Sequence, residues 1–160
     1  MLMPWGNMQV KTIHDFRATV RKLEREVTIG LKENPRTGGL NLVQCHTIIN
    51  LGLKGETTIG AMAKELGVDK STLSRTVDGL VNLELLDRYP HPSDRRYTLI
   101  KLTKQGEKAC KNINDANDQY FQQVFSAIQP IEHENVIKYF NMFVEALLKH
   151  GEKKDPKSTS

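Results

Sequence analysis

Basic side chains gather in one short segment of this 160-residue chain. Between Asp87 and Lys111 there are seven basic and three acidic residues, whereas the rest of the chain holds sixteen of each. The whole net charge of +4 therefore lies in that segment. A concentrated group of cations is typical of a surface that binds a polyanion such as nucleic acid. The alternative is a solvated surface on which cations cluster by chance.

A group of polar side chains just before this segment could contact DNA bases. The planar guanidinium of Arg75 matches the N7 and O6 edge of guanine, although Arg75 could instead pair with Asp78, three residues later. The short hydroxyl side chains nearby suit phosphates and thymine methyl groups; they belong to Ser71, Thr72 and Ser74. For Ser71 and Thr72, local helix capping is an equal alternative.

Further cations and a helix start could hold the DNA backbone. Arg95 and Arg96 follow a turn that could insert a side chain into the narrow minor groove. We expect one of them to enter the groove and the other to pair with Asp94, and the sequence does not say which. Lys70 suits a phosphate, and Thr58 begins a helix whose N-terminus could receive another.

The elements that must position these side chains follow from the spacing of the apolar residues. Two short segments have helical spacing and are joined by a turn that contains Gly67. The period then changes to that of two strands, and the arginines lie between them. A hairpin with an arginine tip directly after a helix-turn-helix is the layout of a winged helix. The expected elements are helices over 58–66 and 70–83, capped by Thr58 and Asp69, and strands over 85–89 and 97–102.

Longer helical patterns flank this unit, so we expect a mainly α fold with a small β-wing. The first and last of these patterns carry apolar stripes broader than a single small lobe could bury, which indicates a partner. Pro130 fits the first turn of the last helix. The expected flanking helices cover 8–32, 40–53, 103–128 and 131–150.

The stretch from Gly67 to Gly106 resembles the MarR family of winged helix-turn-helix transcriptional regulators. The matching pieces are STLSR (71–75), VDGL (77–80), LLDR (85–88), PSDRR (92–96) and Leu102-Thr103. One departure is Glu84, where such proteins usually place a glycine to end the recognition helix. Because glutamate adopts a positive φ less readily than glycine, we expect the helix exit to differ slightly.

The resemblance implies an obligate homodimer whose first and last helices interlock. Residues 8–33 and 104–150 would be dimerisation helices, and residues 40–103 a winged helix-turn-helix DNA-binding domain. The polar residues 151–160 are expected to form a flexible tail. The dimer would be a cytoplasmic repressor that binds double-stranded DNA at a pseudo-palindromic operator.

Such regulators often bind small aromatic ligands in a crevice between the dimer helices and the winged lobe. The candidates for lining such a crevice in this chain are Phe16, Arg17, His46 and Tyr120. Core packing is the alternative for the aromatic members.

Other chemistries have little support in the sequence. Cys45 and Cys110 are too few for a disulfide scaffold, and no apolar run reaches the roughly 18 residues of a membrane span. We find no nucleophile motif, phosphate loop or metal-ligand spacing, so no enzyme activity, metal or cofactor is expected. Two alternatives stay open. One is a dimeric winged-helix interaction protein without specific DNA binding, and the other is a regulator that senses oxidants through Cys45 or Cys110.

Overall fold

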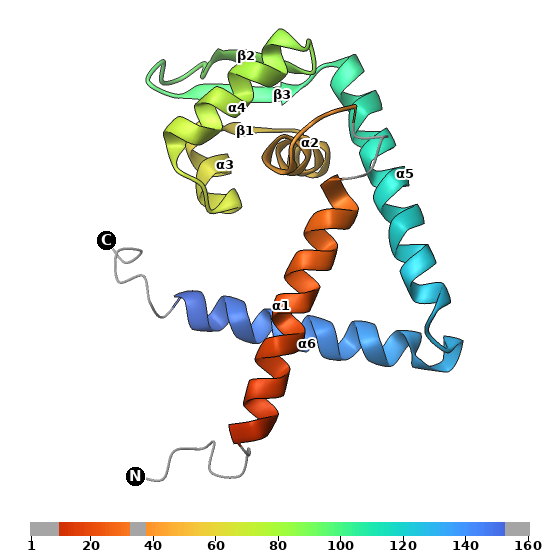
Figure 1. Ribbon diagram of the computed structural model, residues 1–160. Coiled ribbons are helices and arrows are strands. Elements are labelled where there is room, and N and C mark those ends of the chain that lie inside the picture. The colour runs from red at the N-terminus through yellow and green to blue at the C-terminus, as the bar shows by residue number, and fades with distance from the viewer. Residues whose placement is uncertain (1–9, 33–37, 153–160) are drawn as a thin grey trace, which may run out of the picture. The chain divides into compact units, whose positions relative to one another are not determined.

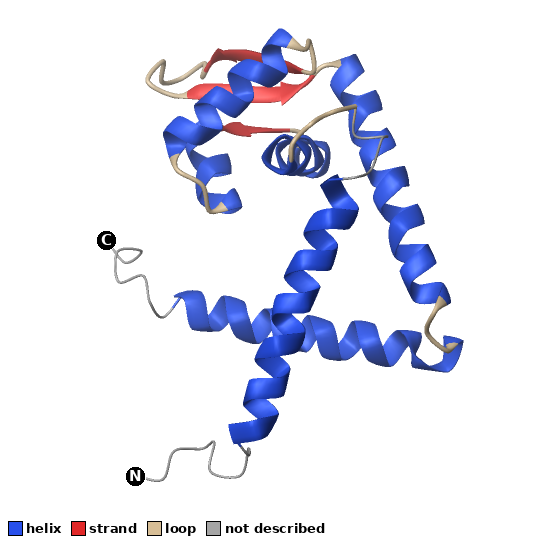
Figure 2. Cartoon of the chain, viewed as in Figure 1, coloured by secondary structure: helices blue, strands red, loops and turns tan. Residues whose placement is uncertain are grey.

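The computed structural model describes residues 10–32 and 38–152 (Figure 1, Figure 2). These residues are mainly helical with one small sheet, which confirms the predicted fold class. None of the described helices is long and apolar enough to cross a membrane. The elements in chain order are α1 (Val10–Lys32), α2 (Leu42–Lys54), β1 (Glu56–Thr58), α3 (Ile59–Leu66), α4 (Lys70–Asn82), β2 (Leu86–Pro90), β3 (Thr98–Leu102), α5 (Lys104–Ser126), η2 (Pro130–Glu132) and α6 (His133–Glu152).

Side-chain caps begin the helices from α2 to α5. Asn41 and Gln44 form a reciprocal capping box at α2, in which the Gln44 N–H donates to Asn41 Oδ1 at 3.0 Å. Thr58 and Asp69 cap α3 and α4, as the sequence predicted. The hydroxyl oxygen of Thr103 accepts a backbone N–H in the first turn of α5. Because each cap satisfies a backbone donor that a helix start leaves free, short local patterns set these boundaries.

The sheet is antiparallel, with the strand order β1–β3–β2. The predicted hairpin is the pair β2–β3, in which Leu86 lies opposite Leu102. β1, which the sequence analysis did not predict, pairs with the other edge of β3 and sets Thr57 opposite Ile100. A strand of three residues is too short to show an alternating pattern, so its pairing with β3 is what defines it.

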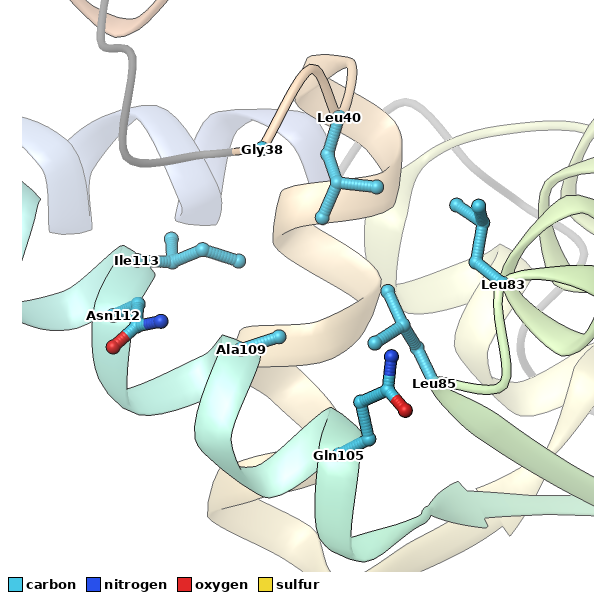
Figure 3. Close-up of a pocket in the computed structure, with 8 residues that line it drawn as sticks. All are labelled: Gly38, Leu40, Leu83, Leu85, Gln105, Ala109, Asn112 and Ile113. Atoms are coloured by element: carbon cyan, nitrogen blue, oxygen red, sulfur yellow. The ribbon is translucent and has the colours of Figure 1, made fainter.

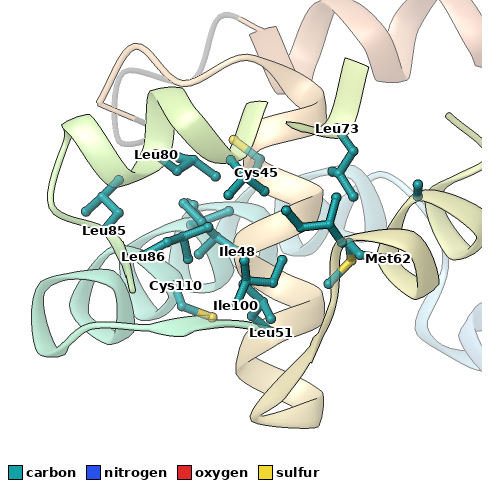
Figure 4. Close-up of a cluster of buried hydrophobic side chains, with 14 residues drawn as sticks. Cys45, Ile48, Leu51, Met62, Leu73, Leu80, Leu85, Leu86, Ile100 and Cys110 are labelled. Atoms are coloured by element: carbon teal, nitrogen blue, oxygen red, sulfur yellow. The ribbon is translucent and has the colours of Figure 1, made fainter. Parts of the chain in front are cut away.

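A cluster of buried apolar side chains holds this lobe together (Figure 4). Its members with almost no exposed surface are Ile48, Leu51, Met62, Leu73, Val77, Leu80, Ile100 and Ile113. Cys110 and Ile113 come from α5, and the compact unit extends through Asn117. The lobe therefore includes the first half of α5, beyond residue 103, where the predicted DNA-binding domain ends. The dimerisation roles of the flanking helices stay predictions.

Helix α4 ends at a residue in the left-handed conformation that is not glycine. Glu84 has a φ of 59°, and its N–H donates to Val81 O at 2.9 Å. The next N–H, of Leu85, donates to Leu80 O at 2.9 Å. These two bonds form the Schellman arrangement that a glycine usually completes. The expected difference in the helix exit was therefore wrong, because Glu84 adopts the glycine conformation at a cost of about 1–2 kcal/mol.

The second compact unit holds the end of α5, η2 and α6. His133 Nε2 lies 3.1 Å from Phe125 O in the last turn of α5 and 3.0 Å from Ile128 O just after it, so its N–H can donate to these carbonyls. Pro130 was predicted in the first turn of the last helix. It begins the short η2 turn instead, and α6 starts at His133. Residues 153–160 of the predicted tail lie outside the described residues.

Helix α5 approaches the α4–β2 connection very closely at Gly106. A Cβ at position 106 would lie 2.0 Å from Leu85 O, whereas a Cβ at Gly60 in α3 would meet no heavy atom within 4 Å. We expect Gly106→Ala to lower the free energy of unfolding by about 3 kcal/mol, because backbone must move to admit the methyl group. Gly60→Ala should leave it unchanged or raise it by up to about 1 kcal/mol. Urea denaturation of both variants provides the measurement, and equal effects would contradict the close approach.

Candidate nucleic-acid interface

Helices α3 and α4 form a helix-turn-helix whose turn depends on Gly67. This residue has a φ of 64°, and the following Val68 N–H donates to Ala63 O at 3.0 Å. The turn thereby satisfies the carbonyls at the end of α3 before Asp69 begins α4. Helix α4 packs against α2, α3 and β2, so the hairpin lies beside it (Figure 1).

Asp69 accepts a network of hydrogen bonds at the start of α4. The Thr72 N–H donates to it at 2.8 Å, and the hydroxyls of Ser71 and Thr72 donate to its two oxygens. The hydrogen bond from Ser71, followed by those from Thr72, holds the pKa of Asp69 well below its usual range. Of the two alternatives for Ser71 and Thr72, the structure shows the local one, in which their hydroxyls donate to the carboxylate that caps the helix. Their hydroxyl protons are already donated to Asp69.

The exposed face of α4 carries Ser71, Arg75, Asp78 and Asn82, opposite its buried apolar stripe. The alternative ion pair between Arg75 and Asp78 is not formed. Asp78 Oδ1 instead accepts from Nη1 of Arg88, which lies on β2. Among the described residues Arg75 has no ion-pair or hydrogen-bond partner, so its guanidinium is available. The pair between Asp78 and Arg88 could not be predicted from the sequence, because ten residues separate the two and no local spacing indicates it.

The two arginines at the tip of the wing differ, because only Arg96 has an acidic partner among the described residues. Arg96 donates to both oxygens of Asp94, from Nε at 3.0 and 3.1 Å and from Nη2 at 2.7 Å. This hydrogen bonding lowers the pKa of Asp94 and raises that of Arg96. Arg95 is exposed and has no partner among the described residues. The sequence did not show which arginine pairs with Asp94. In the free protein it is Arg96, and the guanidinium of Arg95 is available to a ligand.

A groove of 450 Å³ lies between the start of α3, the start of α4 and the wing. Thr58 and Ser74 contribute polar groups to it, and Lys70, Arg88 and Arg96 contribute positive charge. Thr58 Oγ1 accepts from the Ala61 N–H, while the first backbone N–H groups of α3 have no partner within the helix. A helix N-terminus beside cations has the chemistry to hold an anion such as a phosphate.

Comparisons with known proteins agree with this architecture. The model of the MarR family matches residues 40–98. The HTH-type transcriptional regulator YpoP of Bacillus subtilis is 29% identical over 136 residues, which cover 84% of this chain and 96% of YpoP. These findings support a winged-helix regulator of the MarR type. The relatives that it matches are transcriptional regulators of a non-enzymatic family, which agrees with the expectation that the chain is not an enzyme.

Solved structures share this fold. RV1404 from Mycobacterium tuberculosis superimposes with a TM-score of 0.69 at 27% identity, covering 88% of this chain and 95% of that one. A mutant MarR from E. coli, solved in complex with operator DNA, superimposes with a TM-score of 0.70 at 20% identity, covering 86% and 99%. At that identity the second likeness concerns the fold alone.

A small pocket lies elsewhere in the lobe, beside the exit of α4 (Figure 3). It measures 240 Å³ and is lined by Leu40, Leu83 and Leu85 facing Gln105, Ala109, Asn112 and Ile113 of α5, with Gly38 at its edge. The four residues that the sequence analysis assigned to a ligand are not part of this lining, and their role stays a prediction.

The two thiols are poor candidates for oxidant sensing. Cys45 and Cys110 are both buried, and burial raises the pKa of each thiol, so the reactive thiolate is disfavoured. Within the described residues no three His, Cys, Asp or Glu side chains lie close enough together to hold a metal ion.

The Asp69 network predicts a specific dependence of stability on acid. Because its pKa is lowered on folding, Asp69 contributes stability that is fully present above the unfolded pKa of about 3.9 and is lost as the pH falls below it. Asp69→Asn keeps a capping oxygen and removes the charge. We expect the melting temperature of this variant to fall less than that of the wild type between pH 6 and pH 3.

A matched control for this prediction is Asp118→Asn on α5. Asp118 is exposed and makes no hydrogen bond within the described residues, so its variant should follow the wild-type pH profile. Thermal denaturation followed by circular dichroism at each pH provides the measurement. If Asp69→Asn also followed the wild-type profile, the proposed coupling of the cap to acid stability would be wrong.

Proposed function

We propose that this protein is a homodimeric regulator of the MarR type that binds a specific DNA duplex, acts as a repressor and responds to a small ligand. The observation that carries the proposal is that three exposed cations on α4 and at the tip of the wing have no acidic partner among the described residues. They are Lys70 at the start of α4, Arg75 on its exposed face and Arg95 on the wing. Cations that the fold does not neutralise are available to phosphates and base edges.

The arrangement of these cations supports binding across two grooves. With α4 in the major groove, Arg75 would reach guanine N7 and O6. Arg95 would enter the adjacent minor groove, while Arg96 keeps Asp94 and stiffens the wing. Lys70, Ser74 and the start of α3 line one groove and would hold a backbone phosphate. The fold shared with a MarR that was solved on operator DNA supports this placement.

Exposed apolar stripes support a second copy of the chain as the partner. On α6, Ile137, Phe140 and Leu147 each expose about half of their surface, and on α1 Phe16 does so too. These positions recur at helical spacing, so each helix presents a continuous apolar face. Faces of this kind cost free energy in water and indicate an interface. Two-fold symmetry would then place two copies of α4 on a pseudo-palindromic site.

The pocket beside the α4 exit supports a response to a small ligand. Its 240 Å³ lies below the common range of roughly 300–1,000 Å³, so it suits a molecule of about one ring. The lining combines apolar side chains with the amides of Gln105 and Asn112. The assignment of Phe16, Arg17, His46 and Tyr120 to a ligand is the alternative location. A panel of aromatic acids and amides that changed neither DNA affinity nor melting temperature would contradict this part of the proposal.

Separate variants of Arg75 and Arg95 test the DNA-binding proposal. The probes are a duplex that the wild type selects from a random-sequence pool and a scrambled duplex of equal length. Arg75→Ala should weaken the selected duplex about tenfold or more and the scrambled one little, because a base contact is lost. Arg95→Ala should weaken both and reduce the salt slope of binding by about 1. Fluorescence anisotropy over a range of salt concentrations measures both effects.

Arg96→Ala is the matched control for Arg95→Ala, because it removes the same charge from the same turn. Its guanidinium is paired with Asp94, so its loss should weaken DNA binding less than the loss of Arg95. If the wild type showed no salt-sensitive binding to any duplex, the interaction-protein alternative would replace the proposed function. If Arg75→Ala weakened both duplexes equally, Arg75 would be a backbone contact.

If the apolar face of α6 forms the dimer interface, a charge placed on it should separate the two copies. Phe140 is 49% exposed, so Phe140→Glu should leave the chain folded and convert the dimer into a monomer at micromolar concentration. Asn141→Glu adds the same charge at the neighbouring exposed residue and should leave the dimer intact. Sedimentation equilibrium gives the masses, and circular dichroism checks the fold. A monomeric wild type, or a Phe140→Glu dimer of wild-type affinity, would contradict the proposed homodimer.

A further inference from the structure

An acidic side chain lies on the face of α4 that would enter a DNA groove, where it would be close to phosphates. Asp78 is the one acidic residue in the sequence of α4, and it lies on the same exposed stripe as Arg75. Residues three apart on a helix are neighbours, so the Asp78 carboxylate is within pairing range of the Arg75 guanidinium. Such a pair would occupy the group that is best suited to guanine. A free Asp78 would also repel nearby phosphates.

We propose, on the basis of the proposed DNA-binding function, that Arg88 is a positioning residue that keeps Arg75 available by holding Asp78. The Arg88 side chain extends from β2 and donates through Nη1 to Asp78 Oδ1. Both side chains remain about half exposed, at 44% for Arg88 and 53% for Asp78. The pair therefore lies at the surface of the lobe, where it also connects the third turn of α4 to the wing.

The backbone around Arg88 explains why it can compete with Arg75 for Asp78. Arg88 pairs with Ile100 of the central strand, and Ile100 is fully buried. Its Cα is thus fixed by the sheet, and the guanidinium reaches α4 from a rigid element. The same side chain lines the groove with Lys70, Ser74 and Arg96. Within the described residues, Asp78 uses one of the five guanidinium N–H donors of Arg88, so the charge of the pair is balanced without closing the groove.

The proposal predicts that loss of Arg88 reduces sequence specificity, although Arg88 itself need not contact a base. In Arg88→Ala, Asp78 would be free to pair with Arg75. An i,i+3 pair on a helix surface is weak, so the expected loss is about three- to tenfold on the selected duplex at low salt. The scrambled duplex should lose less, and the ratio of the two affinities should fall. Asp78→Asn in the same chain should restore that ratio, because the competing charge is gone.

The experiment compares wild type, Arg88→Ala, Asp78→Asn and the double variant on selected and scrambled duplexes. Recovery of the wild-type affinity ratio in the double variant is the expected result. If Arg88→Ala weakened both duplexes equally and the double variant were no better, Arg88 would be a phosphate contact and the proposal would be wrong. If Asp78→Asn alone lost specificity, Asp78 would itself read a base, which also overturns it. Thermal melts check that each variant is folded.

A measurement without DNA separates this proposal from the proposed function. The ¹⁵Nε–¹H resonance of Arg75 in the free protein should shift in Arg88→Ala and return in the double variant, because only the single variant leaves Asp78 both charged and unpaired. An unchanged Arg75 resonance in Arg88→Ala would overturn the proposal even if DNA binding were confirmed. The matched control is the exposed pair Lys111–Asp115 on α5, at 3.1 Å. Lys111→Ala should affect neither the resonance nor the affinity ratio.

Discussion

The winged lobe depends on how firmly α4 is held at both ends and along its buried face. Asp69 fixes the first turn through its hydrogen bonds, and the Schellman bonds around Glu84 fix the last. Between them Leu73, Val77 and Leu80 are fully buried. An α-helix anchored in this way cannot rotate about its axis without exposing its apolar stripe. The direction of the opposite stripe, which carries Arg75, is therefore a consequence of core packing.

Aspartates of the same lobe hold polar and basic side chains in place, and two of them neutralise an arginine. Asp69 holds Ser71 and Thr72, while Asp78 and Asp94 each hold an arginine. An exposed ion pair contributes little stability, about 0–1 kcal/mol, so the effect of these pairs on the fold is modest. Their larger effect is on charge, because a neutralised arginine attracts a phosphate less than a free one. The net charge of +4 does not convey this distinction.

Local patterns in the sequence were sufficient for the helices and the hairpin, and non-local ones were not. Thr58 and Asp69 act within three residues of themselves, so their caps could be predicted. β1 is defined only by its pairing with β3, and the Asp78–Arg88 pair only by the packing of α4 beside β2. The sequence also left the choice between Arg95 and Arg96 open, since both follow Asp94 within two residues. Three-dimensional geometry was needed for each of these.

Glu84 shows how a strained residue can be retained where it links two functional elements. Its carbonyl accepts from Thr103 Oγ1 at 2.7 Å. The next residue, Leu85, donates its N–H to Leu80 O and accepts the Thr103 N–H with its own carbonyl. These bonds hold the left-handed conformation in place despite its cost. Leu83 and Leu85, on either side of Glu84, line the pocket beside the α4 exit. A ligand that displaced either leucine would act on the backbone dihedral that joins the recognition helix to the wing. Because that dihedral is already strained, a modest difference in binding free energy between two conformations would suffice to shift it.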